Sequence, residues 1–191
     1  MKLSLPRLLL LGLAVPAIAR GETYSLTADF SPTENRAIGT WSYRMDDGAN
    51  PLPEFPLLPA ATRDANALWG SDFPSPPMMW SDATGYWGIG KNTTGKELFS
   101  SRNDTRWAPG EVLLHPKGGP SPSGLVVAWT APGNRVIDLH YSVGLASAQS
   151  NGVGLRIVKR LGGVDTPVLV LHDIGSSLSN ALTGIALAGG D

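Results

Sequence analysis

Residues 136–143 read VIDLHYSV, and this stretch decides the fold class of the chain. Apolar and polar side chains alternate along it, which places one set on each face of an extended strand. The apolar set is Ile137, Leu139, Tyr141 and Val143, and the polar set is Asp138, His140 and Ser142. Such alternation is typical of antiparallel strands that pack on one face only, so we expect the polar set, His140 included, to face solvent. Residues 153–160 form another strand-length segment, and its first part repeats the pattern, with Val153, Leu155 and Ile157 opposed to Arg156.

Further strand-length segments lie on both sides of this stretch. They are residues 23–30, 38–45, 125–129, 168–172 and 182–187, and clusters of Gly, Pro, Asn and Ser separate the later ones. No segment shows the apolar spacing of an amphipathic helix over more than two turns. The sequence therefore predicts an all-β fold, an antiparallel two-sheet β-sandwich. A turn signal at Ala188-Gly189-Gly190-Asp191 follows the last segment, so we expect one or two closing strands to be missing from this sequence.

The segment between residues 50 and 77 has a different character. It contains seven prolines, Pro51, Pro53, Pro56, Pro59, Pro74, Pro76 and Pro77. Proline has no N–H to donate to a strand ladder, so we expect a long surface excursion with one turn of helix near residues 63–68. Residues 20–191 are then a single domain, which has to rest on its hydrophobic core because the chain contains no cysteine.

The first nineteen residues have the pattern of a secretory signal peptide. Lys2 and Arg7 precede an apolar run that ends at small residues, Ala17 and Ala19. The run is shorter than the ~20 residues that span a bilayer, so cleavage after Ala19 is favoured over an uncleaved membrane anchor. We therefore expect a secreted or cell-surface protein with no membrane span after cleavage.

The charge balance argues against nucleic acid as a partner. The chain carries 15 Lys and Arg against 16 Asp and Glu, for a net charge of −1. Loss of Lys2 and Arg7 with the leader makes the mature chain more acidic. No basic patch with interleaved aromatic residues occurs, so binding through phosphate neutralisation is not expected.

Several short stretches resemble a family of exported bacterial β-sandwich modules. The matching residues are Asp29–Ser31, Gly39–Tyr43, Asn92–Gly95, Leu114–Pro116 and Val127–Pro132. These modules occur in planctomycete, verrucomicrobial and proteobacterial surface proteins, some with a PEP-CTERM sorting tail. The resemblance implies a jelly-roll-like sandwich, similar to carbohydrate-binding domains, with a non-catalytic surface role. Members usually have two more strands after a Gly-Asp turn like Gly190-Asp191.

The residues give no signature of catalysis or of a bound metal. The three histidines, His115, His140 and His172, lack the local spacing of a metal site. No Gly-x-Ser-x-Gly elbow is present, and Asp46-Asp47-Gly48 fits a β-turn better than a calcium loop. We predict no catalytic residue, no metal ligand and no cofactor.

An aromatic cluster is the best candidate for a binding site. Its residues, with the polar groups beside them, are Trp69, Trp80, Asp82, Tyr86, Trp87 and Asn92. An exposed flat ring can stack on a sugar while amides and carboxylates bind its hydroxyls. Core packing is the alternative, and we expect at least two of the four rings to be buried. Trp41, Trp107 and Trp129 fall in or beside strand patterns and are expected in the core.

Three functions follow, each with its own structural mark. The first is a non-catalytic secreted or surface module that binds or organises an extracellular polymer such as polysaccharide, marked by exposed tryptophans in a concave patch. The second is a structural module that contacts other proteins, marked by buried tryptophans and a flat polar face. The third is a glycan-processing enzyme, which requires two carboxylates about 5–10 Å apart in a cleft.

Overall fold

The computed structural model describes residues 21–36, 40–46, 55–60, 79–82, 88–101, 104–116, 124–147, 150 and 152–189. The leader predicted over residues 1–19 lies outside them. The described elements are α1 (Leu26–Asp29), β1 (Trp41–Asp46), β2 (Trp80–Ser81), β3 (Gly88–Lys91), β4 (Leu98–Ser100), β5 (Thr105–Trp107), β6 (Val112–His115), β7 (Gly124–Trp129), β8 (Arg135–Val143), β9 (Val153–Leu161), β10 (Val164–Ile174) and β11 (Leu178–Leu187). All of the paired strands run antiparallel, which confirms the all-β class.

The strand predicted over residues 23–30 is wrong, because a single helical turn, α1, occupies its second half. Ser25 begins this turn as its N-cap: its Oγ accepts a hydrogen bond from the Ala28 N–H at 3.2 Å. In return, the Ser25 N–H donates to Asp29 Oδ2 at 2.8 Å. These reciprocal bonds satisfy N–H groups that the first turn of a helix leaves free, and they outweigh the strand-like alternation of Tyr24 and Leu26.

β1 and β7 form the antiparallel pair that joins the two halves of the chain. Trp41 lies opposite Trp129, and the register continues to Asp46 opposite Gly124. The Asn35 side chain supports β1 from the side, because its Oδ1 accepts from the Tyr43 N–H at 2.8 Å and its Nδ2 donates to the carbonyl oxygens of Tyr43 and Leu58. The strands predicted at 38–45 and 125–129 are thus confirmed within the described residues.

Residues 55–60 are the described part of the predicted proline-rich excursion. They lie along β1, with the Leu58 N–H donating to the Tyr43 carbonyl at 2.9 Å and the Met45 N–H donating to the Pro56 carbonyl at 3.1 Å. Leu58 is only 2% exposed. This hexapeptide therefore contributes to the core, while the rest of the excursion and the helical turn predicted at 63–68 lie outside the described residues.

The core gathers side chains from five separate segments, Phe30, Tyr43, Leu58, Trp80 and Ile89. The rings of Phe30 and Tyr43 stack with centroids 4.8 Å apart, and Trp80 follows at 6.4 Å from Tyr43. Burial raises the pKa of the Tyr43 phenol. Full burial of each large apolar side chain stabilises the fold by roughly 1.5–3 kcal/mol, so this cluster is a main source of stability.

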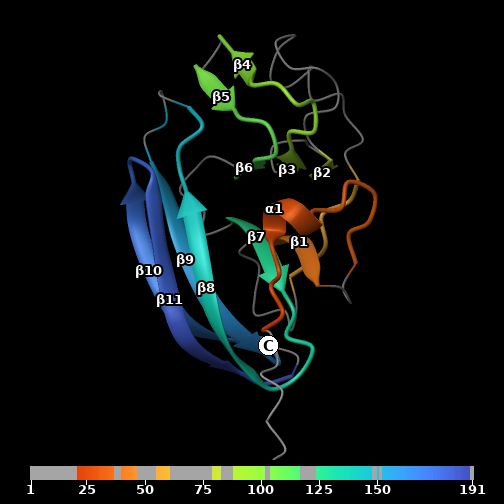
Figure 1. The fold of residues 1–191 in the computed structure, drawn as a ribbon, viewed down its shortest axis with the longest axis vertical. Coiled ribbons are helices and arrows are strands. Elements are labelled where there is room, and N and C mark those ends of the chain that lie inside the picture. The colour runs from red at the N-terminus through yellow and green to blue at the C-terminus, as the bar shows by residue number, and fades with distance from the viewer. Residues whose placement is uncertain are drawn as a thin grey trace, which may run out of the picture.

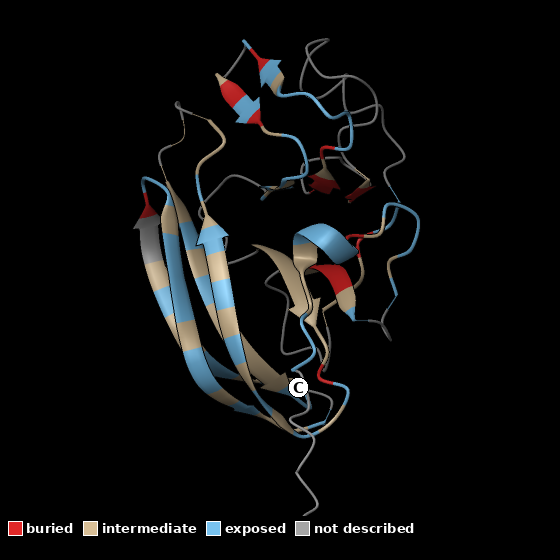
Figure 2. Ribbon diagram, in the orientation of Figure 1, coloured by how far each residue is buried: buried red, intermediate tan, exposed pale blue. Residues whose placement is uncertain are grey.

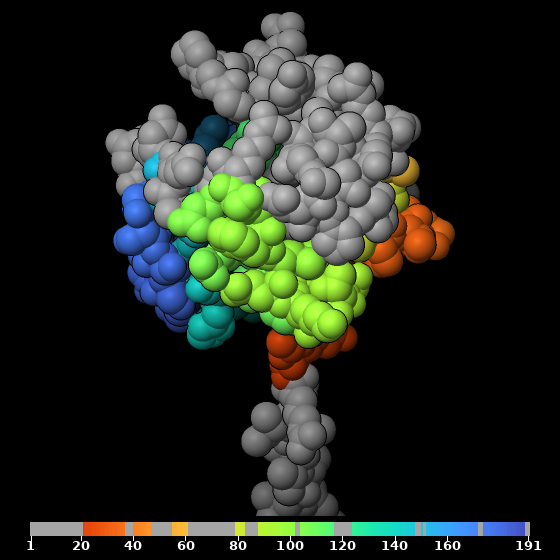
Figure 3. All heavy atoms as spheres, turned by 90° about the horizontal axis from the view of Figure 1, so that it is seen from above, coloured from red at the N-terminus to blue at the C-terminus, as the bar shows by residue number. Residues whose placement is uncertain are grey.

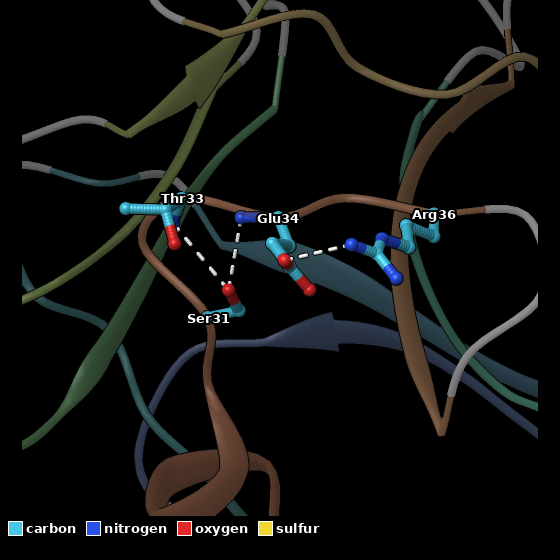
Figure 4. A network of polar contacts seen from close by, with 4 residues as sticks. All are labelled: Ser31, Thr33, Glu34 and Arg36. Atoms are coloured by element: carbon cyan, nitrogen blue, oxygen red, sulfur yellow. Dashed lines mark hydrogen bonds and ion pairs between the residues drawn. The ribbon is translucent and has the colours of Figure 1, made fainter.

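A polar turn links α1 to β1 (Figure 4). Ser31 Oγ accepts hydrogen bonds from the backbone N–H groups of Thr33 at 3.4 Å and Glu34 at 2.9 Å. Arg36 forms an ion pair with Glu34 at 2.7 Å. Both charged side chains are exposed, so the pair contributes at most about 1 kcal/mol. The turn is fixed chiefly by the serine.

Two smaller sheets continue from the core. β3 pairs with β2 on one side and β6 on the other, and β4 pairs with β5 as a separate hairpin. The Arg106 N–H donates to the Ala146 carbonyl at 2.7 Å, which ties this hairpin to the segment after β8. Seen from above, the yellow-green surface around β4 and β5 and the blue C-terminal strands lie on the same face (Figure 3).

The four long strands form two curved ribbons on one side of the molecule (Figure 1). β8 pairs with β11, and β9 pairs with β10. Along β8 every second residue is exposed, and Figure 2 shows the resulting alternation. The alternation predicted for residues 136–143 and 153–157 is confirmed. β10 and β11 are longer than the predicted segments, because residues 164–167 and 178–181, which mix polar and apolar side chains, also pair.

Candidate functional site

The structure describes three of the six predicted ligand-binding residues. These are Trp80, Asp82 and Asn92, whereas Trp69, Tyr86 and Trp87 lie outside the described residues. Trp80 is 6% exposed, packs among the core rings and donates from Nε1 to the Ser31 carbonyl at 3.0 Å. A sugar has no access to a ring in this position. Trp80 therefore serves the core, as does Trp107, while Trp41 and Trp129 are half-buried.

Asn92 also has a structural role. It is 2% exposed, and its Nδ2 donates to the carbonyl oxygens of Lys96 and Trp107, both at 2.8 Å. Its Oδ1 accepts from the N–H and the hydroxyl of Thr94. All of the amide's described contacts are within the protein, so it joins the end of β3 to the following turn and to β5. Asp82 follows β2 and is half-buried.

An exposed polar strip on the β8–β11 ribbon is the best candidate site in the described chain. We call it the outer strip, and define it as Asp138, His140 and Ser142 of β8 with Ser179 and Ala181 of β11. Ser142 lies directly opposite Ser179, and His140 lies opposite Ala181. Cross-strand partners share a face of the sheet, so these five exposed side chains form one surface. The exposure predicted for His140 is confirmed.

A β-bulge shapes the end of the outer strip. The register of β11 on β8 shifts between Leu182 and Ile185. Gly184 adopts φ +69° there, and its N–H donates to Asp138 Oδ1 at 2.9 Å. Glycine accepts this left-handed backbone conformation with little strain. The bond holds one oxygen of Asp138 in place at the end of the strip.

The chemistry of the outer strip suits hydrogen bonding with a neutral polyol. The carboxylate accepts, while the imidazole and the hydroxyls both donate and accept. The strip itself contains no large apolar side chain. The nearest exposed large apolar residue along β8 is Val136, two residues before Asp138. The sequence revealed the β8 half of the strip through its alternation, but it could not show that β11 supplies the other half.

An open apolar groove of about 440 Å³ lies between the ribbons. It is lined by Lys159, Leu161, Val164, Thr166 and residues 186–188. Leu161 and Val164 are 52% and 68% exposed, and both flank the turn between β9 and β10. Lys159 Nζ donates to the Ala186 carbonyl at 3.1 Å and so connects the two ribbons.

A charged cluster fixes the start of the described chain onto β7 and β8. The Tyr24 hydroxyl donates to Glu22 Oε2 at 2.6 Å, and Arg135 pairs with the same carboxylate at 3.4 Å. The pKa of Glu22 is lowered, mainly by the hydrogen bond from Tyr24 and to a smaller extent by the interaction with Arg135. The bond to Glu22 raises the pKa of Tyr24. The Tyr24 and Trp129 rings lie 5.2 Å apart. This arrangement positions the segment against β7 and β8.

No family model, curated protein or solved structure matches the chain. The outer strip is therefore interpreted from its own chemistry. Among the described residues, no three His, Asp or Glu side chains gather as a metal ion would require. Nor does any helix in that part of the chain have the length and apolar character to cross a membrane.

Proposed function

We propose that the chain is a non-catalytic exported module that binds or organises an extracellular polymer, with polysaccharide as the ligand class. The observation that carries this proposal is the outer strip. Asp138, His140 and Ser142 repeat along one exposed face of a strand, and they offer the donors and acceptors that sugar hydroxyls need.

The shape of the strip favours a polymer over a small molecule. Small ligands are bound in concave, largely apolar sites. The outer strip instead lies on an exposed strand face, and a nine-residue strand such as β8 is about 30 Å long. A repeating, extended ligand would meet the same kinds of polar group at successive positions along such a face.

The proposal includes the architecture and the location of the protein. We infer a two-sheet, jelly-roll-like sandwich in which the half-buried faces of the two ribbons cover the interior. Ile137 and Leu139 on β8, and Leu155 and Ile157 on β9, support it because each is less exposed than its neighbours in the alternating part of its strand. The leader pattern at residues 1–19 supports export with cleavage after Ala19. The resemblance to bacterial surface modules supports a cell-surface or secreted role.

A second candidate is a purely structural module that makes protein contacts. The burial of Trp80 and Trp107 favours it, and the short side chains of the outer strip also permit close packing against another protein. The two candidates differ in whether the chain binds an isolated polysaccharide. Glycan processing would require a pair of carboxylates across a cleft, which the outer strip, with its single carboxylate, does not provide.

The test is calorimetric titration of the mature chain, from residue 20 onward, with a panel of neutral and acidic soluble polysaccharides. The His140→Ala/Ser142→Ala double variant removes two groups of the outer strip. We expect its affinity to fall about tenfold or more, since each lost hydrogen bond contributes roughly 1 kcal/mol. Thr166→Ala, an exposed polar position on β10, is the matched control and should bind as the wild type does.

A Trp87→Ala variant tests the aromatic platform separately. Binding that is lost in Trp87→Ala but kept in the double variant would move the site to the predicted aromatic cluster. Trp80→Ala is unsuitable for this purpose, because removal of a core ring destabilises the fold by about 3–5 kcal/mol. A folded protein that binds no member of the panel would overturn the polysaccharide proposal and favour the structural module.

A further inference from the structure

The outer edge of β11 is built like a pairing edge without a partner strand. β11 runs for ten residues and pairs with β8 along one edge. No other strand in the described part of the chain pairs with its second edge. Its sequence, LSNALTGIAL, contains neither a charged residue nor a proline. Natural edges usually carry such residues or a β-bulge, because these features discourage pairing with another chain. β11 has a bulge between Leu182 and Ile185, so Leu178–Leu182 is the regular part of its edge.

Two backbone groups on the second edge of β11 form hydrogen bonds with side chains, at positions where a neighbouring strand could form them instead. The Ala181 N–H donates to Asn180 Oδ1 at 2.8 Å, and the Ala186 carbonyl accepts from Lys159 Nζ at 3.1 Å. Both contacts are exposed. Alternate residues of a strand direct their N–H and C=O groups toward opposite edges, so groups bound outside the β8 ladder mark the second edge. The Asn180 and Lys159 side chains thus occupy hydrogen-bonding positions that the backbone of another strand could take over.

The charge of the strands indicates what fits this edge. β9 carries Arg156, Lys159 and Arg160, so two β9 edges would bring like charges together. β10 contains Pro167, which donates no hydrogen bond. Two copies of β11 can pair without like-charge repulsion and without a proline in the ladder. The whole chain, at a net charge of −1, adds little repulsion between copies.

We propose that a second copy of this chain pairs along the free edge of β11, antiparallel and about a two-fold axis. The ribbons of the two copies then form one four-stranded sheet, in the order β8, β11, partner β11, partner β8. A two-stranded ribbon is marginal in water, and the larger sheet stabilises both copies. Antiparallel pairing about a two-fold axis is self-complementary and therefore closes at a dimer. This inference depends on the edge of β11 and not on the outer strip.

Sedimentation velocity of the mature chain over a range of concentrations tests the proposal. We expect a monomer–dimer equilibrium. Lys159→Met frees the Ala186 carbonyl, so the dimer should form at an at least threefold lower concentration. Ala181→Pro removes the edge N–H and should abolish the dimer, with circular dichroism to show that the variant is folded. A wild-type chain that stays monomeric at all concentrations, as it would if another part of the chain covered this edge, overturns the proposal.

Single cysteines provide a second measurement that does not depend on the proline variant. The chain has no cysteine of its own, so a short bismaleimide reports one position at a time. Pairing of the regular edge, Leu178–Leu182, with its copy places the two-fold axis near Asn180, so Ala181→Cys lies close to its counterpart and should cross-link to it. His140→Cys, its direct cross-strand neighbour on the same exposed face, is the matched control and should remain uncross-linked, since two further strand spacings separate the copies there. Equal cross-linking at both positions would indicate random collision and would also overturn the proposal.

Discussion

The Asn92 side chain, which is only 2% exposed, joins three segments of the chain through its hydrogen bonds. We predict that Asn92→Ala lowers the free energy of unfolding by about 3 kcal/mol, because it removes the donor to the carbonyl oxygens of Lys96 and Trp107 and the acceptor for the Thr94 N–H and hydroxyl. Urea denaturation followed by circular dichroism measures this loss. The control is Asn134→Ala, where an exposed asparagine accepts one hydrogen bond from the Gly189 N–H.

The control variant should lose no more than about 1 kcal/mol, since water can replace an exposed bond. Equal losses in the two variants would contradict a structural role for Asn92 and return it to the ligand-binding candidates.

At the scale of single residues, the sequence predicted the exposure of His140 correctly because local alternation decides it. It could not place Trp80, whose burial depends on Ser31 and Tyr43, far away in the chain.

At the scale of single elements, the bulge in β11 depends on one glycine. Gly184 has φ +69°, and a Cβ built there would meet nothing within 4 Å. Gly184→Ala therefore tests backbone strain without a steric clash. We predict a loss of about 1 kcal/mol in the free energy of unfolding, measured by urea denaturation.

Gly124 of β7 is the matched control for this substitution. It also has open space around its Cβ position, but its φ lies outside the left-handed region. Gly124→Ala should leave stability unchanged or raise it slightly, because alanine loses less backbone entropy on folding. A Gly184→Ala variant as stable as Gly124→Ala would mean that the bulge relaxes, and with it the position of Asp138.

The elements differ in how far the sequence predicts them. Strands β7, β8 and β9 were predicted because their apolar residues alternate or run together between turn signals. The start of β10 was missed because Asp165, Thr166 and Pro167 look like a turn, although the first two lie opposite Arg160 and Lys159 in the hairpin. α1 was missed because a cap at Ser25, rather than any apolar period, determines it. The signal that identifies it is a Ser followed four residues later by an Asp.

At the scale of the whole molecule, burial is uneven (Figure 2). The buried rings and aliphatic side chains of the main core come from β1, β2, β3, the residue that follows α1 and the segment at residues 55–60. The long ribbons contain mostly half-buried residues, with Ile174 as their one fully buried apolar side chain among those described. Stability drawn from buried apolar area should therefore be concentrated around β1 and β3.

Native-state hydrogen exchange tests this distribution. We predict that the amides of Tyr43, Leu58 and Ile89 exchange only through global unfolding, whereas those in β8 and β11 exchange through a smaller opening of lower free energy. Ile89→Val should lower the exchange free energy of the core amides by about 1 kcal/mol. Ile137→Val, the same change at a half-buried position of β8, should lower the values in the ribbons and in the core alike, because global unfolding also unfolds the ribbons. If both variants lower all amides equally, the molecule unfolds as one cooperative unit and the ribbons are as stable as the core.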